Sequence, residues 1–92
     1  MIARIATESQ YRLDDEAAAQ LNELDNEAVA AVDAGDEDRF HEVFEQMLDL
    51  VRREGAPLGE DELEESDVIL PPPDISFVEA GAEFTGEGLI PD

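Results

Sequence analysis

The stretch from Asp14 to Gly55 constrains the fold most, because its apolar residues recur with the period of an α-helix. Its first half carries an apolar stripe formed by Ala17, Leu21, Leu24, Ala28 and Val32. Its second half carries another, formed by Phe40, Val43, Phe44, Met47, Leu50 and Val51. The connection at Gly35 is too short for anything but an antiparallel helical hairpin. We therefore predict a helical hairpin over 14–55 that packs through these two stripes.

The predicted ends of these helices carry residues that stabilise helix termini. Asp14 or Asp15 can cap the first helix, whose positive end favours carboxylates. Gly35 is suited to the left-handed position that ends this helix near Ala34, and the next helix starts at Asp36. The second helix ends at Gly55 and Pro57, after Arg52 and Arg53, which offset the negative end of its dipole.

The segment before the helices favours a β-hairpin over 1–13. Residues 1–6 are apolar and suited to a strand, residues 7–9 form a polar turn, and residues 10–13 alternate between apolar and polar side chains. An isolated hairpin is barely stable in water, so its apolar face should pack on the helices.

The segment 56–73, which we call the arm, contains an acidic run and three consecutive prolines. We expect it to lie on the surface of the molecule as a linker. Leu58, Leu63 and the apolar triplet 68–70 should anchor it, because an extended apolar triplet before proline needs to be covered.

The last segment, 74–92, should hold a short helix and an extended tail. Ser76 and Glu79 have the spacing of a capping box, which places the start of the helix at Phe77. Gly86 or Gly88 should end it, and the tail should dock beside the β-hairpin. The whole chain is thus predicted to be one α+β domain, with a β-hairpin packed on a helical hairpin, an extended arm and a short C-terminal helix.

Charge is the strongest compositional signal, with 26 acidic residues against five arginines and a formal net charge of −21. Such a surface repels itself unless salt screens it, and the screening length falls from about 10 Å at 0.1 M to about 3 Å at 1 M salt. Because the acidity is spread over all segments, it favours a halophilic cytoplasm. An ordinary acidic protein with a basic partner, or a mimic of nucleic acid, is the alternative.

Several partners and environments are disfavoured. The chain has no cysteine, so it can form neither disulfides nor a thiolate zinc site. It lacks the cationic surface that nucleic acids and anionic membranes require, and no apolar run is long enough to insert into a membrane. We expect a cytoplasmic protein.

Candidate residues for chemistry are few. His41 is the only histidine, and with Glu42 and Glu45 it falls short of the three or four protein ligands that a zinc site needs. A solvent-facing histidine is the simpler interpretation. The sequence contains no nucleophile motif, phosphate-binding glycine loop or calcium-binding loop. We predict neither enzymatic activity nor a cofactor.

The predicted β-hairpin carries the one local departure from uniform acidity. Its candidate partner-binding residues are Arg4, Gln10, Tyr11 and Arg12. If both arginines project outward beside the tyrosine, they form a cationic and aromatic patch for carboxylates of a partner. Alternatively, the arginines pair internally with the neighbouring carboxylates of Glu8, Asp14 or Asp15.

The chain resembles the PspA-associated protein family over nearly its whole length. The matching strings are residues 1–5 (Met-Ile-Ala-Arg-Ile), 10–15 (Gln-Tyr-Arg-Leu-Asp-Asp), 21–25 (Leu-Asn-Glu-Leu-Asp), 66–72 (Ser-Asp-Val-Ile-Leu-Pro-Pro) and 88–91 (Gly-Leu-Ile-Pro). The turn at 6–9 departs from the family, in which glycine is expected there. The resemblance implies a non-enzymatic accessory protein that associates with PspA, a coiled-coil, ESCRT-III-like protein of the membrane stress response. With the acidity, it points to an archaeal halophile and to recruitment to the inner face of the cell membrane through PspA.

A different class of function stays open at this point. The open edges of a two-stranded hairpin invite pairing with a second copy. The chain would then be a free-standing homodimeric regulator, or a sensor with a small-ligand pocket lined by Tyr11 and arginines.

Overall fold

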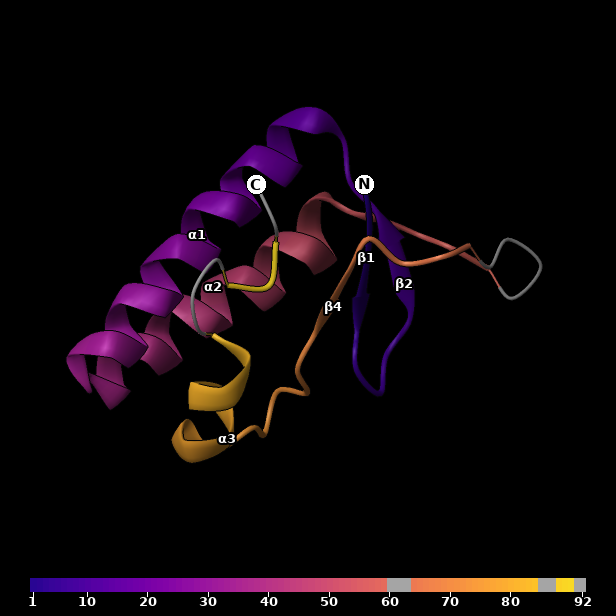
Figure 1. Ribbon diagram of the computed structural model, residues 1–92. Helices are drawn as coiled ribbons and strands as arrows, with labels where there is room; N and C mark the ends of the chain where they lie inside the picture. Colours follow the sequence, from indigo (N-terminus) through magenta and orange to yellow (C-terminus); the bar gives the residue numbers. More distant parts are fainter. Residues whose placement is uncertain (60–63, 85–87, 91–92) are drawn as a thin grey trace.

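The computed structural model describes residues 1–59, 64–84 and 88–90. Its elements are, in chain order, β1 (Ile2–Ile5), β2 (Gln10–Arg12), α1 (Asp15–Ala34), α2 (Glu37–Glu54), β3 (Ala56–Pro57), β4 (Val68–Leu70) and α3 (Phe77–Glu83). Figure 1 shows α1 and α2 lying side by side, with the sheet toward the open end of the helical hairpin and α3 below it. The predicted α+β fold is confirmed.

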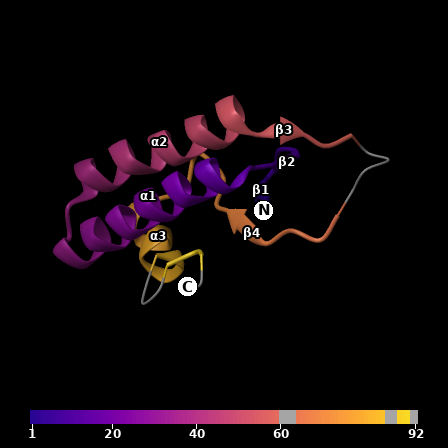
Figure 2. The ribbon, with the colours of Figure 1, turned by 90° about the horizontal axis from the view of Figure 1, so that it is seen from above.

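Side-chain caps define both long helices as the sequence predicts. The Asp14 carboxylate accepts a hydrogen bond from the Ala17 amide at 2.8 Å. Gly35 has a left-handed backbone with φ of 70°, and its N–H closes the end of α1. Asp36 then caps α2 by accepting from the Arg39 amide at 3.1 Å. The chain therefore reverses direction within the two residues between α1 and α2. Figure 2 shows the resulting antiparallel pair from above.

The core lies between this helical pair and a second layer made of the sheet and α3. Every residue of the predicted stripe on α2 is buried. At the C-cap of α3, the Phe84 ring contacts the rings of Phe40 and Phe44 on α2, with centroids 5.1 Å and 6.0 Å away. Ala3, Ile5 and other side chains on the inner face of the sheet complete this core.

The predicted stripe on α1 needs one correction. Leu24 and Val32 are only partly buried, whereas Asp25 and Ala31 are buried in the same helix. Asp25 is 0% exposed, and its buried carboxylate is satisfied by hydrogen bonds from the amides of Leu89 and Ile90 at 3.0 Å and 2.9 Å. The buried face of α1 is therefore turned toward the C-terminal tail, which docks on α1 and not beside the β-hairpin.

Within residues 1–59, 64–84 and 88–90 the sheet has four strands, two more than the predicted hairpin, in the order β3-β2-β1-β4. β2 pairs antiparallel with β1 and with β3, while β4 pairs parallel to β1. Both ends of the arm thus become edge strands. Pairing covers both edges of a hairpin that would be marginal alone.

The remaining predictions for the arm and the C-terminal segment are largely met. Leu58 is buried, as are Val68 and Leu70 of the apolar triplet. Ser76 accepts from the Glu79 amide at 3.2 Å, and α3 begins at Phe77. The prediction that Gly86 or Gly88 ends this helix is wrong, because α3 ends at Glu83 with Phe84 as its C-cap. The predicted role of Leu63 lies outside the described residues.

Candidate partner-binding surface

The pairing of β1 with β2 decides which of the predicted site residues meet. Arg4 lies opposite Gln10, and Arg12 lies opposite Ile2. Since side chains alternate between the faces of a sheet, Arg4, Gln10 and Arg12 share the outer face, away from α1 and α2. Tyr11 lies opposite Ala3 and packs against the core from the inner face. The structure therefore brings three of the four residues together and separates the tyrosine from them.

Gln10 is not available on this outer face, because the arm covers it. The residue as a whole is 5% exposed. The amide Nε2 donates to the Glu64 carbonyl oxygen at 2.6 Å and to the Ser66 hydroxyl oxygen at 2.8 Å. Its Oε1 accepts from the Glu64 amide at 3.3 Å. Gln10 thus anchors the returning half of the arm to the sheet.

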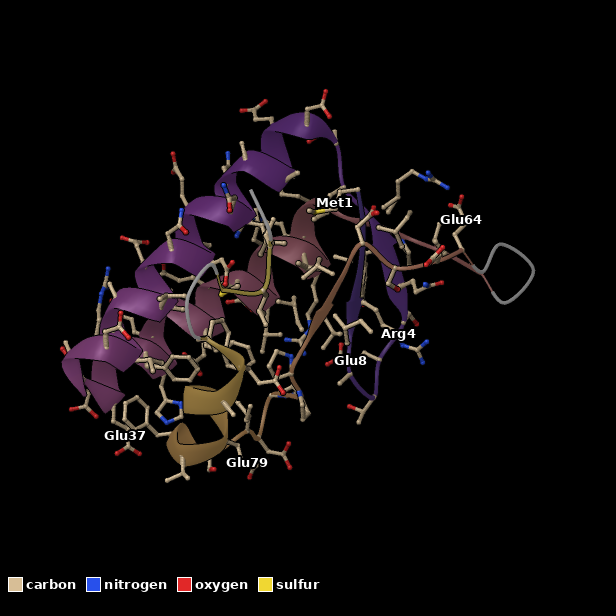
Figure 3. All side chains as sticks on the ribbon, in the orientation of Figure 1. Met1, Arg4, Glu8, Glu37, Glu64 and Glu79 are labelled. Carbon is tan, nitrogen blue, oxygen red and sulfur yellow. The ribbon has the colours of Figure 1, made fainter. Side chains whose placement is uncertain are left out.

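The two arginines differ in their surroundings. Arg12 forms an ion pair with the Glu64 side chain of the arm. Arg4 is exposed and, within the described part of the chain, forms no ion pair. Figure 3 shows Arg4 and Glu64 on the side of the sheet that faces away from the helices. Internal pairing does occur, although Arg12 uses Glu64 and not the nearby carboxylates that the sequence suggested.

Further contacts close the outer face. Ile2 and Leu58 are buried at 6% and 8% exposure. The Ile2 amide donates to the Asp67 carboxylate at 2.8 Å, and its carbonyl oxygen accepts from the Asp67 amide at 2.8 Å. The predicted patch is therefore largely an internal contact between the sheet and the arm. Sequence reasoning missed Glu64, Ser66 and Asp67 because carboxylates and serines in an acidic loop carry no periodic signal.

An open surface lies instead between the two long helices. The middle cavity, of about 340 Å³, is lined by Gln20, Glu23, Leu24, Glu27, Gln46, Asp49, Leu50 and Arg53. A cavity of about 110 Å³ adjoins it, lined by Asp14, Glu16, Ala17, Gln20 and Glu54. A third, of about 320 Å³, is lined by Glu27, Ala30, Ala31, Ala34, Asp36 and Arg39. We call this surface the inter-helix groove.

The three cavities are neighbours along the helical pair, since the middle one shares the lining residue Gln20 with one and Glu27 with the other. All their lining residues belong to α1, α2 or the caps of these helices. Partly buried Leu24 and buried Leu50 form the apolar floor of the middle section. The groove thus follows the helical pair over the whole length of α1.

Carboxylates dominate the rim of the inter-helix groove. Two guanidinium groups interrupt them, from Arg53 and Arg39. Arg39 reaches from α2 to Glu27 on α1, with 3.3 Å between Nη2 and Oε1, so this pair crosses the groove near the turn between the helices. An arrangement of this kind suits binding through surface complementarity better than chemistry on a small substrate.

The sites considered for chemistry lie elsewhere. His41 is exposed, and its Nε2 lies 3.7 Å from Glu37 and not beside Glu42 or Glu45. Over the described ranges, no three His, Cys, Asp or Glu side chains are placed to hold a metal ion. Glu8 has a pKa below its ordinary value, because Arg52 hydrogen-bonds to its carboxylate at the turn between β1 and β2. That ion pair does not line the inter-helix groove.

Comparison with known protein families places the chain. A family model described as PspA-Associated protein matches residues 1–92, the whole chain. The chain belongs to the PspA-associated protein family. No curated protein and no solved structure matches it. In the part of the chain that the structure describes, no helix is long and apolar enough to cross a membrane.

Proposed function

We propose that this chain is a non-enzymatic accessory protein that associates with a PspA-like coiled-coil protein in an envelope stress response. The inter-helix groove carries this proposal, because an open groove along a pair of helices suits a helical partner. Membership of the PspA-associated family supports the choice of partner. The open groove with carboxylates along its rim supports docking over catalysis, which requires converging titratable groups in a cleft.

Affinity capture tests the association directly. The tagged chain is used as bait in a salt-rich lysate of its native organism, beside an unrelated bait of equal size and net charge. PspA should be enriched on the tagged chain and not on the control bait. Purified PspA should then bind the purified chain at the same salt concentration. If PspA is absent from the captured proteins, or equally present on the control bait, the association is contradicted.

We further propose that the chain reaches the inner face of the cell membrane only through its partner. A net charge of −21 repels an anionic bilayer, so direct binding is unfavourable. Vesicles containing anionic lipids should sediment the chain when PspA is present and leave it in solution when PspA is absent. Sedimentation of the chain alone would contradict this route.

The same charge supports a halophilic, archaeal origin. Helical content should be incomplete in dilute buffer and should rise as salt screens the carboxylates over the range from about 0.1 M to about 1 M. Circular dichroism during a salt titration measures this. Full folding in dilute buffer would contradict the proposed adaptation to salt.

A second candidate function is a free-standing homodimeric regulator, and the exposed strand β4 favours it. Ile69 on β4 is 59% exposed, beside a cavity of about 280 Å³ that Leu70, Pro71 and Ile75 help to line. Within the described residues, β4 pairs only with β1, so its other edge can accept a strand. Analytical ultracentrifugation should then detect a dimer that Ile69→Lys dissociates. A monomer at all concentrations would exclude this candidate.

A further inference from the structure

The length of the inter-helix groove indicates the kind of molecule that it fits. The groove extends along α1 from its cap Asp14 to Asp36, the cap of α2. A helix of 20 residues such as α1 is about 30 Å long. A small molecule would occupy a fraction of this length, whereas one helix of similar length would fill it.

The shape of the groove changes along its length in a way that suits a helix. Leu24 and Leu50 provide an apolar floor in the middle section. Toward the turn between the helices, Ala30, Ala31 and Ala34 line the groove, and side chains this small allow close approach of a third backbone. An amphipathic helix could therefore place an apolar stripe against the middle and turn-end sections, with polar side chains facing the section lined by Asp14, Glu16 and Glu54.

The charges on the rim select among such helices. Carboxylates of Glu16, Glu23, Asp49 and Glu54 flank the floor from both sides. A helix with lysine or arginine beside its apolar stripe would meet these carboxylates, whereas a second copy of this chain would bring a further net charge of −21 against them. Charge complementarity thus favours a basic helix from a partner over self-association at this surface.

We propose that the inter-helix groove seats one amphipathic, basic-flanked helix of the PspA-like partner, which completes a three-helix arrangement with α1 and α2. This inference rests on the proposed function and names the surface that it uses. At the turn end of the groove, the Arg39–Glu27 pair lies across the path of the incoming helix. The pair opens when the helix binds, so that Glu27 accepts a cation of the partner in place of Arg39.

Two variants with equal changes in net charge test whether the partner helix binds in the inter-helix groove. The groove variant combines Glu23→Lys, Asp49→Lys and Glu54→Lys, none of which removes a hydrogen bond or ion pair between α1 and α2 among the described residues. The control variant combines Asp33→Lys, Glu65→Lys and Asp74→Lys, all exposed and outside the groove lining. Circular dichroism first establishes that both fold. Titration calorimetry with purified PspA should then give affinity weakened about tenfold or more for the groove variant and nearly unchanged for the control.

A labelling experiment gives a second readout that does not depend on charge. Because the chain has no cysteine, Gln46→Cys introduces a single labelling site in the groove, and Asp74→Cys introduces one outside it. A spin label at position 46 should lose mobility when PspA is added, whereas a label at position 74 should not.

The outcomes separate this inference from the proposed function. One outcome is that PspA binds the unmodified chain and yet loses the same affinity for both variants, or immobilises neither label. In that case the inter-helix groove is not the binding surface, and the association with PspA still stands. If PspA fails to bind the unmodified chain, the proposed function fails and the inference fails with it. Immobilisation of a label at position 46 by a second copy of the chain alone would assign the groove to self-association and overturn the proposed occupant.

Discussion

The outer face of the sheet and the inter-helix groove carry the same kinds of side chain, but the fold uses them in opposite ways. On the sheet, Gln10 is 5% exposed and bonded to the arm, and Arg12 pairs with Glu64. In the groove, Gln46 and Glu23 are exposed. A polar side chain therefore indicates a candidate partner surface only where it forms no hydrogen bond or ion pair that covers it within the chain.

The same contrast occurs on opposite sides of a single helix. Asp25 of α1 is 0% exposed beneath the C-terminal tail, whereas Glu23, two residues earlier, lies on the rim of the groove. Their side chains differ by one methylene group, so the difference in environment decides their roles. This pair gives the largest effect by which the comparison can be tested.

Asp25→Ala should lower the free energy of unfolding by about 3 kcal/mol, because two hydrogen bonds to its carboxylate are lost and the Ile90 amide stays buried without a partner. Glu23→Ala should change it by less than about 0.5 kcal/mol, as is usual for exposed positions. Urea unfolding measures both, since urea adds no ions to an acidic protein. Equal values for the two variants would show that the tail contributes little to stability.

Gln10→Ala and Gln46→Ala apply the same comparison to an amide on the sheet and one in the groove. Gln10→Ala should cost about 2 kcal/mol, because the arm loses its hydrogen bonds at Glu64 and Ser66. Gln46→Ala should cost less than about 0.5 kcal/mol. Hydrogen exchange at the Glu64 amide should accelerate only in the first variant. Unchanged exchange there would contradict the anchoring role of Gln10.

The helical region could be predicted from the sequence because its signals are local. The apolar period of α2, the left-handed Gly35 and the Asp36 cap each involve neighbours within a few residues. They therefore appear in the sequence without knowledge of the fold. The helical hairpin follows from them directly.

The sheet beyond its first two strands could not be predicted, because its pairing is non-local. β3 has two residues and β4 has three, and β4 meets β1 across more than sixty positions of sequence. Segments this short carry no usable period. For the same reason, the hydrogen-bond partners of Gln10 and Asp25 could not be told apart in the sequence from many similar carboxylates and amides. Nor could the sequence show that the arm covers the predicted patch.

The sheet region and the helical region also differ in which residue type occupies a left-handed backbone position. Thr7 in the turn between β1 and β2 and Gly35 between the helices both have φ of 70°. Thr7 occupies the third position of a turn closed by the Glu8 amide on the Ile5 carbonyl oxygen at 2.8 Å, where glycine is usual. The helical region thus has glycine, which adopts the left-handed conformation without strain, whereas the sheet region has threonine, which does not.

Thr7→Gly should raise the free energy of unfolding by about 0.5–1 kcal/mol, because relief of left-handed strain exceeds the entropy cost of glycine. Gly35→Ala should lower it by about 1 kcal/mol, since a Cβ there meets nothing within 4 Å and only the backbone is strained. Urea unfolding of both variants measures the two changes. Destabilisation by Thr7→Gly would show that the threonine side chain makes a contact worth more than the strain.

The smallest expected effect concerns the ion pair that joins the two regions, between Glu8 at the β1–β2 turn and Arg52 on α2. Hydrogen bonds from Arg52 hold the pKa of Glu8 below its ordinary value of 4.5, although burial opposes them. A carboxylate whose pKa is depressed on folding stabilises the protein above its unfolded pKa, and this contribution is lost as pH falls through the folded pKa. Arg52→Gln should therefore cost less than about 1 kcal/mol near pH 7, as expected for a partly exposed pair.

The gap in stability between parent and Arg52→Gln should close as the pH falls below 4.5, because protonated Glu8 no longer attracts the guanidinium. Measuring the gap, and not the parent alone, removes the general effect of neutralising the other carboxylates. Arg53→Gln is the matched control, since Arg53 pairs only with the adjacent Glu54 among the described residues and should show no such gap. A gap that persists at low pH would mean that Arg52 joins the regions by packing of its aliphatic chain and not by charge.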